Sequence, residues 1–357
     1  MKIYTLTFHW ATNYGAVLQA YALQQFLIEQ GFDVQIIDYV PKVQRKTFFK
    51  AFRARSFKQL LSQLDEYKKE KKINYFRRKY LHLTLNFATN EALKKFEWEN
   101  GIFICGSDQI WNPYFTMDGE KKVTTSYFFD FVSNGSPKIA YAASFGTEKL
   151  EQKMVEIINT YLEKFSLLTV REQSAVNMLS EIGYESFLVC DPVFLLKKEK
   201  YMNIVGPKQD NSNGQTIFKY ILHQNQKCAH QIAEFVAEKK GLKFVKQMNV
   251  LGIEDWLKNL MDCQIVVTNS FHALAFSIMF HKPFIAVLVK NSGMNDRIFT
   301  LLKSVNLLDF AITEYDENEI MSKLNRKIDW NEVDKLLENQ RQESSKLLLN
   351  EIQKVLE

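Results

Sequence analysis

Residues 265–276 read Ile-Val-Val-Thr-Asn-Ser-Phe-His-Ala-Leu-Ala-Phe. The run opens with the β-branched residues typical of a strand buried inside a parallel sheet. It breaks at the polar turn 268–270 and continues as an apolar helix. A strand, a tight turn and a helix place the turn at the carboxyl edge of a parallel sheet, where open α/β folds bind ligands. The free N–H groups and positive dipole end of such a helix favour a phosphate or a carboxylate.

His272 falls in the first turn of this helix and is the only titrating side chain of the stretch. A single histidine on an apolar helix is often a core residue whose ring bonds a backbone carbonyl. The alternative is a catalytic group at the ligand edge. These twelve residues leave both interpretations open, and the rest of the chain favours the second.

The composition is that of a globular protein with two domains. The chain has 357 residues, of which 46% are hydrophobic and 24% charged, and this length exceeds one ordinary core. The four cysteines, at 105, 190, 228 and 263, form no Cys-x-x-Cys pair, so we expect free thiols in a reducing compartment. The chain starts with a strand, and no apolar run reaches the roughly 18 to 20 residues of a transmembrane helix. We therefore expect a cytoplasmic protein.

The first forty residues predict a β–loop–α–β unit, the start of a Rossmann-like sheet. A strand at 3–8 precedes a loop with Asn13 and Gly15, then a helix at 16–30 and a second strand at 34–39. One glycine stands where a dinucleotide fingerprint needs three. Gly15 lets the backbone approach a ligand and Asn13 can cap the helix, although a simple turn glycine explains Gly15 equally well.

Residues 42–80 form a basic insertion after this unit. They contain fourteen lysines and arginines against three acidic residues, with aromatic residues interleaved. We expect amphipathic helices, for which three interpretations compete. The insertion is a solvated surface, or it docks on an anionic membrane, or it binds nucleic acid. No known nucleic-acid module accompanies the charge, so we expect no nucleic-acid partner.

Small and polar residues follow two further strands of the first half. The strand at 103–105 runs into Gly106, Ser107, Asp108 and Gln109, and the strand at 139–143 runs into Ser144. Such groups at the carboxyl ends of strands describe a ligand edge. Asp108 can act as a base, orient a sugar hydroxyl or cap the next turn.

A domain boundary is expected near residue 190. Arg171 ends the strand at 167–170, where it can grip a carboxylate or phosphate bidentately or form a structural salt bridge. Residues 187–196 predict the last strand and the crossing to a second α/β domain. The expected domains are thus 1–190 and 191–357, the second ending in a charged helix from residue 330 that can pack on either domain.

Several of these strand ends occur together in one order along the chain. They are Thr12-Asn13-Tyr14-Gly15-Ala16 with Gln19, Gly106-Ser107-Asp108-Gln109, Ser144-Phe145-Gly146, Arg171-Glu172, Asp191-Pro192 and Thr268-Asn269-Ser270-Phe271-His272. Together they resemble the polysaccharide pyruvyl transferase family, from residue 3 to about residue 310. The resemblance implies two Rossmann-like domains facing a cleft, as in glycosyltransferases of the B type. It also implies phosphoenolpyruvate as donor and a glycan, often lipid-linked, as acceptor of a cyclic pyruvate ketal.

The resemblance also suggests roles for individual residues. The expected catalytic residues are His272 as general acid and Asp108 as base or acceptor-orienting group. The expected donor site, in the second domain apart from Arg171, comprises Arg171, Asn269, Ser270, Lys290 and Arg297. The expected acceptor or cleft-lining residues of the first domain are Asn13, Tyr14, Gly15, Gln19, Gly106, Ser107, Gln109 and Ser144. We expect no cofactor and no metal.

The chain departs from the family at one point. Many members carry Arg-Leu-His at the helix start where this chain has Ser270-Phe271-His272, and that arginine is thought to hold the donor's carboxylate or phosphate. Arg171, Arg297 and Lys290 are candidates to replace it. Two alternative functions follow: a nucleotide-sugar glycosyltransferase of the same fold, or a non-catalytic glycan-binding protein of a polysaccharide assembly complex.

Overall fold

The chain divides into two compact units, each an α/β layer structure built on its own parallel sheet. The computed structural model describes residues 1–41, 56–116, 124–133, 135–147, 149–206, 215–222, 226–246, 248–289 and 295–357. Unit 1 comprises Met1–Leu196 with Gln340–Glu357, and unit 2 comprises Lys197–Asn339. The observed boundary lies close to the expected one at residue 190, but residues 340–357, expected in the second domain, belong to unit 1.

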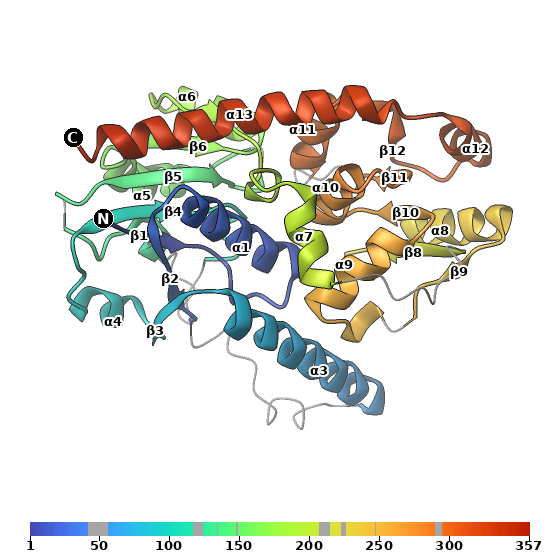
Figure 1. Cartoon of the computed structure of the whole chain (residues 1–357), viewed down its shortest axis with the longest axis horizontal. Helices are drawn as coiled ribbons and strands as arrows, with labels where there is room; N and C mark the ends of the chain where they lie inside the picture. The colour runs from blue at the N-terminus through green and yellow to red at the C-terminus, as the bar shows by residue number, and fades with distance from the viewer. Residues whose placement is uncertain are drawn as a thin grey trace. The chain divides into compact units, whose positions relative to one another are not determined.

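Unit 1 contains a seven-stranded parallel sheet in the order β3-β2-β1-β4-β5-β6-β7 (Figure 1). Its strands are β1 (Lys2–Leu6), β2 (Asp33–Tyr39), β3 (Leu83–Phe87), β4 (Gly101–Cys105), β5 (Lys138–Ala143), β6 (Leu167–Val170) and β7 (Phe187–Leu188). The strand order reverses between β1 and β4. Leu6 pairs with Cys105 at that point, so both strands end side by side at the switch point where open sheets bind ligands.

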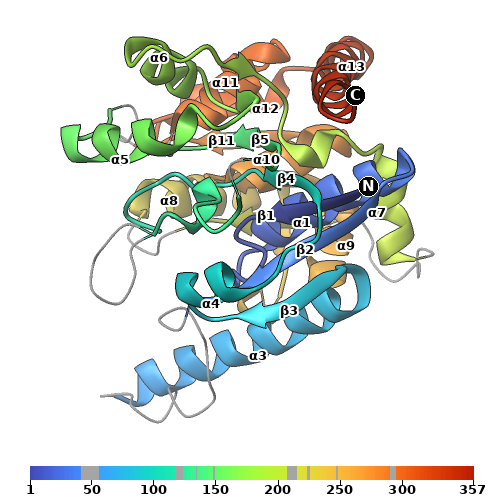
Figure 2. The same cartoon turned by 90° about the vertical axis from the view of Figure 1, so that its left-hand side faces the viewer.

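The described residues before position 190 also form the helices α1 (Tyr14–Glu29), α3 (Phe57–Tyr80), α4 (Asn90–Lys95), α5 (Gln152–Leu162) and α6 (Gln173–Glu181). Asn13 caps α1, because its Oδ1 accepts hydrogen bonds from the N–H groups of Gly15 at 2.9 Å and Ala16 at 3.3 Å. Most of α1 is buried, in accord with its apolar sequence. The basic insertion forms α3 over its described part, and both views place this helix beside the edge strand β3 (Figures 1 and 2).

The C-terminal part of α13 (Trp330–Lys354) packs on unit 1. Leu348 and Ile352 are fully buried there. The Ser344 hydroxyl accepts a hydrogen bond from the backbone N–H of Cys190 at 3.0 Å. The charged tail therefore returns to the first sheet's unit, a choice that its sequence left open.

Unit 2 contains a five-stranded parallel sheet in the order β12-β11-β10-β8-β9. Its strands are β8 (Thr216–Tyr220), β9 (Lys243–Phe244), β10 (Ile265–Thr268), β11 (Phe284–Val287) and β12 (Ala311–Ile312). Its helices before α13 are α7 (Lys198–Val205), α8 (Lys227–Lys240), α9 (Ile253–Asp262), α10 (Phe271–Met279), α11 (Asp296–Ser304) and α12 (Glu317–Asn325). The turn 268–270 follows β10 at the carboxyl edge of this sheet, as the sequence predicts. The strand order reverses between β8 and β10, so the turn also lies at the switch point of unit 2. No helix among the described residues has the length and apolar character needed to cross a bilayer.

Replacing Leu348 with alanine tests whether the tail stabilises unit 1. The variant leaves a cavity in a fully buried position, so we expect the free energy of unfolding to fall by about 2 to 5 kcal/mol, measured by urea denaturation. Lys346→Ala, on the exposed side of the same helix, is the control and should change stability by less than about 0.5 kcal/mol. Equal stability of the two variants would mean that the tail contributes nothing to this core.

Candidate functional site

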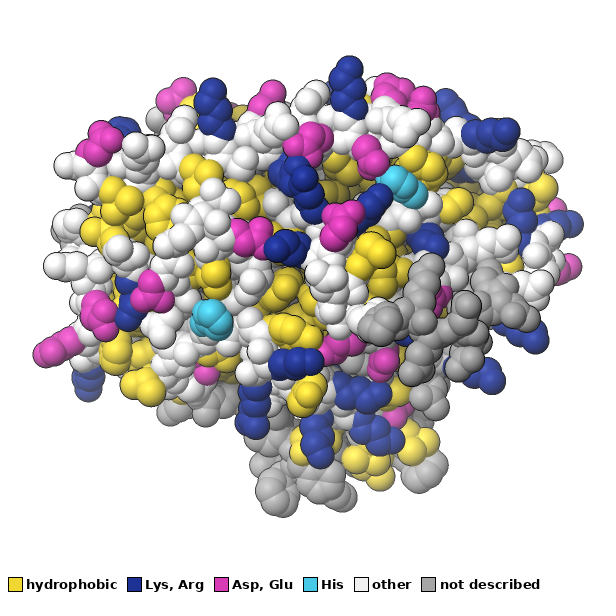
Figure 3. Space-filling model, viewed as in Figure 1, with side chains coloured by type: hydrophobic (Ala, Val, Ile, Leu, Met, Phe, Trp, Pro, Cys, Tyr) yellow, Lys and Arg dark blue, Asp and Glu magenta, His cyan; other side chains and the backbone are white. Residues whose placement is uncertain are grey.

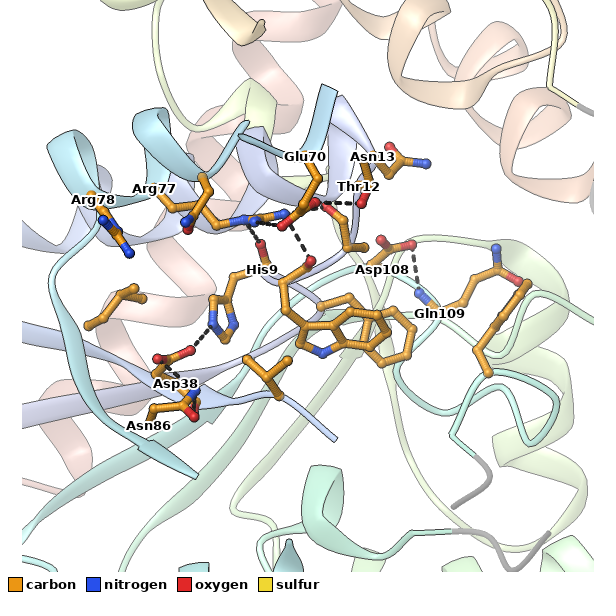
Figure 4. A pocket seen from close by; sticks show the side chains of 17 residues that line it. His9, Thr12, Asn13, Asp38, Glu70, Arg77, Arg78, Asn86, Asp108 and Gln109 are labelled. Atoms are coloured by element: carbon orange, nitrogen blue, oxygen red, sulfur yellow. Dashed lines mark hydrogen bonds and ion pairs between the residues drawn. The ribbon is translucent and has the colours of Figure 1, made fainter. Parts of the chain in front are cut away.

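A cavity of about 670 Å³ opens at the carboxyl ends of β1, β2 and β4 in unit 1 (Figure 4). This volume is in the range of small-molecule sites. Its walls come from the loop after β1, the ends of β2 and β3, the helix α3 and the loop after β4. The lining residues are Phe8, His9, Trp10, Ala11, Thr12, Asn13, Asp38, Val40, Glu70, Asn74, Arg77, Arg78, Leu83, Asn86, Asp108, Gln109 and Phe115.

Arg77 of α3 holds the loop after β1 in place. Its Nε donates to the carbonyl of His9 and its Nη2 to the carbonyls of Trp10 and Ala11, all at 2.8 Å. Its Nη1 donates to Glu70 at 2.6 Å. The side chain is buried, and one planar fork satisfies three consecutive carbonyls that no strand or helix pairs. The basic insertion therefore builds one wall of the cavity.

His9 and Asp38 form a second fixed pair in the cavity wall. His9 Nε2 lies 2.9 Å from Asp38 Oδ1, and Asn86 Nδ2 donates to Asp38 Oδ2 at 2.9 Å. Burial raises the pKa of Asp38, but the hydrogen bonds from His9 and Asn86 and the charge of Arg77 outweigh it, and the pKa lies below its usual 3.8. Asp38 is therefore a permanent anion at neutral pH.

Three polar groups face the cavity with capacity to bind a ligand. Asp108 has a left-handed backbone (φ 76°), and its Oδ1 accepts from the backbone N–H of Gln109 at 2.8 Å. The side-chain Oε1 of Gln109 accepts a hydrogen bond from Asn112 Nδ2 at 2.8 Å, and a Cβ on Gly146 would collide with the Gln109 side chain. Asn13, Asp108 and Gln109 all line the cavity. One carboxylate and two amides suit a ligand rich in hydroxyl groups.

Arg171 lies behind Asp108 in a buried charge cluster. Its Nη1 donates to Asp191 at 2.6 Å and to Ser107 Oγ at 3.0 Å, and its Nη2 lies 3.4 Å from Asp108 Oδ1. Burial lowers the pKa of Arg171, but Asp191, Asp108 and Glu172 outweigh it and raise that pKa. The geometry matches the structural salt bridge that the sequence left as the alternative. A donor anion would have to displace these carboxylates, so the structure does not favour Arg171 as a donor ligand.

Of the expected acceptor residues, Asn13 and Gln109 line the cavity, as does Asp108. Tyr14, Gly15, Gln19, Gly106, Ser107 and Ser144 are buried and absent from its lining. Gln19, for example, donates to Thr7 Oγ1 and to the carbonyl of Ala16, both at 2.8 Å, inside unit 1. The residues of α1 that the sequence placed in the acceptor site therefore lie inside unit 1, because most of α1 is buried.

The sequence reading missed His9, Asp38, Glu70 and Arg77. Glu70 and Arg77 lie seven residues apart, a spacing that places them on one side of a helix. The insertion contains many other charged residues, so this one spacing does not stand out in the sequence. The partners of Arg77 are backbone carbonyls about 66 to 68 residues earlier in the chain, which side-chain patterns do not reveal.

In unit 2 the turn after β10 is held by its own side chains. Ser270 caps α10, and its hydroxyl accepts from the N–H of Ala273 at 3.5 Å. Asn269 accepts from the N–H of Leu222 at 2.6 Å and donates to the carbonyl of Leu222 at 2.9 Å. Asn269 therefore ties the loops after β8 and β10 across the switch point. Its amide serves this positioning role, although the sequence placed it in the donor site.

His272 occupies the first turn of α10 and is 7% exposed. Its ring packs edge-on against Phe271, with centroids 5.1 Å apart. Arg297 lies in the first turn of α11, which follows β11, and is half-buried. Because β10 and β11 are paired neighbours, α10 and α11 begin at the same edge of the sheet. Lys290, the other expected donor ligand, lies outside the described residues.

The comparisons with known proteins identify one family. The family model described as polysaccharide pyruvyl transferase matches residues 13–291. A search of curated proteins finds no match.

Solved structures with a similar fold span nearly the whole chain. The UDP-N-acetylglucosamine 2-epimerase from Rickettsia bellii aligns with TM-score 0.53 and 10% identity, over 99% of this chain and 96% of the epimerase. The UDP-GlcNAc 2-epimerase from Neisseria meningitidis, solved with UDP-GlcNAc, aligns with TM-score 0.51 and 10% identity, over 99% of this chain and 100% of that one. A spinosyn rhamnosyltransferase aligns with TM-score 0.47 and 11% identity, over 98% and 100% of the two chains. The two parallel sheets and the two epimerase alignments show the two-unit α/β fold that the sequence predicts.

Arg77→Lys tests the role of the guanidinium fork. Lysine keeps the positive charge, but its single ammonium group cannot reach all the acceptors that the guanidinium reaches. Most of the hydrogen bonds to the three carbonyls and to Glu70 are therefore lost. We expect a loss of about 2 to 4 kcal/mol in the free energy of unfolding, measured by urea denaturation. Arg78→Lys makes the same change at the adjacent exposed position and should cost less than about 0.5 kcal/mol. Equal losses would show that the loop after β1 does not depend on Arg77.

Asp38→Asn tests the charge in the cavity wall through pH. Since the pKa of Asp38 is lowered in the folded chain, its ionised form stabilises the fold above about pH 4. That contribution is lost as the pH falls through the lowered folded-state pKa. The stability difference between wild type and variant should therefore shrink between pH 6 and pH 3, in urea denaturation at fixed ionic strength. A difference independent of pH would exclude the carboxylate charge as its source.

Proposed function

Because the chain belongs to the polysaccharide pyruvyl transferase family over residues 13–291, we propose that it transfers the pyruvyl group of phosphoenolpyruvate to two hydroxyls of a glycan. The observation that carries the proposal is the family match. Two features of the structure support it. Unit 2 presents a histidine at a helix N-terminus on the edge of its sheet, and unit 1 presents a polar cavity at its switch point.

The reaction sets the chemical requirements. A proton adds to the methylene carbon of phosphoenolpyruvate, and a glycan hydroxyl adds to the central carbon as a base takes its proton. A second hydroxyl then displaces phosphate, which carries away the remaining proton, and the ketal ring closes. The enzyme must therefore supply an acid, a base and a cationic environment for the donor.

We assign the donor to unit 2. His272 is the proposed general acid, since an imidazole can hold and release a proton near neutral pH. The N-terminus of α10 supplies backbone N–H groups and a positive dipole end for the phosphate or the carboxylate. Arg297 supplies a full positive charge at the neighbouring helix start. It is the preferred replacement for the family arginine, because carboxylates already surround Arg171.

We assign the acceptor to the cavity of unit 1. Asp108 is the proposed base, because one of its oxygens is anchored by the backbone N–H of Gln109 while the residue lines the cavity. Arg171 acts as a positioning residue that holds Asp108 from behind. Asn13 and Gln109 would bind sugar hydroxyls through their amides. The proposed acceptor is a lipid-linked oligosaccharide, reached from the cytoplasmic face of a membrane.

His272→Gln tests the donor assignment. We expect phosphate release from phosphoenolpyruvate, measured with a pool of lipid-linked and synthetic oligosaccharides, to fall by at least about 100-fold. The protein should remain folded, as thermal melting would verify. His281→Gln, at the other end of α10, is the matched control and should retain nearly full turnover.

Near-normal turnover of His272→Gln would remove His272 from the acid role and leave it as a core histidine. If wild type releases no phosphate and shows no thermal shift with phosphoenolpyruvate, the donor assignment is wrong. A thermal shift with a nucleoside diphosphate would then favour a sugar-nucleotide donor. Glycan binding without any donor would favour a non-catalytic role.

A further inference from the structure

The helix α3 presents a cationic face of which Arg78 alone also lines the cavity. Its exposed basic residues lie three, four or seven positions apart, or next to each other, and therefore share one side of the helix. They are Lys68, Lys71, Lys72, Arg78 and Lys79, and we call this set the basic strip. Figure 3 shows dark blue side chains gathered in the lower part of the view, where α3 lies in Figure 1.

The opposite side of α3 is committed to the interior of unit 1. Ile73 and Phe76 are fully buried, and Phe76 packs edge-to-face with Tyr21 of α1, with ring centroids 5.8 Å apart. Arg77 points the same way and holds the loop after β1. The orientation of the helix is thus set by its apolar side, and the basic strip is left facing outward.

Two apolar side chains lie on the outward face with the basic strip. Leu61 is 48% exposed and Tyr75 is 63% exposed. Counting 3.6 residues per turn, both fall on the same side as Lys68, Lys72 and Lys79. A face that combines cations with an exposed leucine and tyrosine has the chemistry of an interfacial helix, which draws on anionic lipid headgroups and on shallow apolar insertion. A nucleic acid has no aliphatic layer into which Leu61 and Tyr75 could insert.

We propose that the basic strip of α3, with Leu61 and Tyr75, docks unit 1 on an anionic membrane surface. The same helix contributes Glu70, Asn74 and Arg77 to the wall of the cavity. Docking through α3 therefore holds the cavity within about 10 Å, one helix diameter, of the lipid headgroups. A saccharide carried by a membrane lipid is within reach at that distance. The docking itself depends on surface charge and not on the donor chemistry proposed above.

Vesicle flotation of the full chain tests the proposal without any turnover. Wild type should float with phosphatidylcholine vesicles that contain phosphatidylglycerol, and it should float less in high salt because the charges are screened. It should not float with phosphatidylcholine alone. Lys68→Gln/Lys71→Gln/Lys72→Gln should weaken binding on the order of 100-fold, at roughly fivefold for each cation near the surface. Leu61→Ser/Tyr75→Ser should remove the binding that persists in high salt.

The matched control is Lys239→Gln/Lys240→Gln/Lys243→Gln, which makes the same charge change at exposed positions of unit 2. It should bind vesicles as wild type does. Equal loss in both triple variants would overturn the proposal, since net charge and not the strip would then govern binding. Absence of flotation at low salt would also overturn it, as would tight binding of duplex DNA or single-stranded RNA without binding of vesicles. None of these outcomes bears on phosphate release, which is measured separately.

Discussion

Every strand pair in the two sheets runs parallel, so the carboxyl ends of each sheet gather at one edge. At a switch point the loops leave neighbouring strands in opposite directions, and a hollow opens between them. In unit 1 the chain crosses this hollow at residues 9–11 with carbonyls that no strand pairs. Arg77 supplies the missing donors from α3, a helix inserted between β2 and β3. This guanidinium therefore holds the loop that forms one wall of the cavity.

Arg77 and Arg171, both buried in unit 1, show how a cation can serve a structural role. Burying a guanidinium costs several kcal/mol unless acceptors surround it. Arg77 is matched by three carbonyls and Glu70, and Arg171 by Asp191, Asp108 and Ser107. Both guanidinium groups therefore hold other residues of unit 1 in place. Arg171 can influence a ligand through Asp108, whose carboxylate it anchors from the side away from the cavity.

The start of α10 shows a turn that is held by neutral side chains instead of by a buried cation. Ser270 caps the helix, and Asn269 joins the loops after β8 and β10. The turn therefore keeps its shape through short-range hydrogen bonds of its own. Any charge for an anionic donor has to come from another element, and the start of α11 with Arg297 shares this edge.

The strand, turn and helix around His272 follow from sequence, because β-branched runs, a capping serine and helical periodicity are local signals. For the same reason the sequence predicted two parallel α/β units, whereas the family was identified from the resemblance of several motifs at strand ends. It did not reveal which polar residues meet: Arg77 reaches back to the loop after β1, and Arg171 faces carboxylates rather than an open edge. Those partners are far apart in the chain, and several are backbone carbonyls that have no sequence signature. The local elements were determined by the sequence alone, whereas the lining of the cavity and the outward face of α3 were decided by packing. A helix carries polar groups on several sides, and only the burial of its apolar side selects which of them point inward.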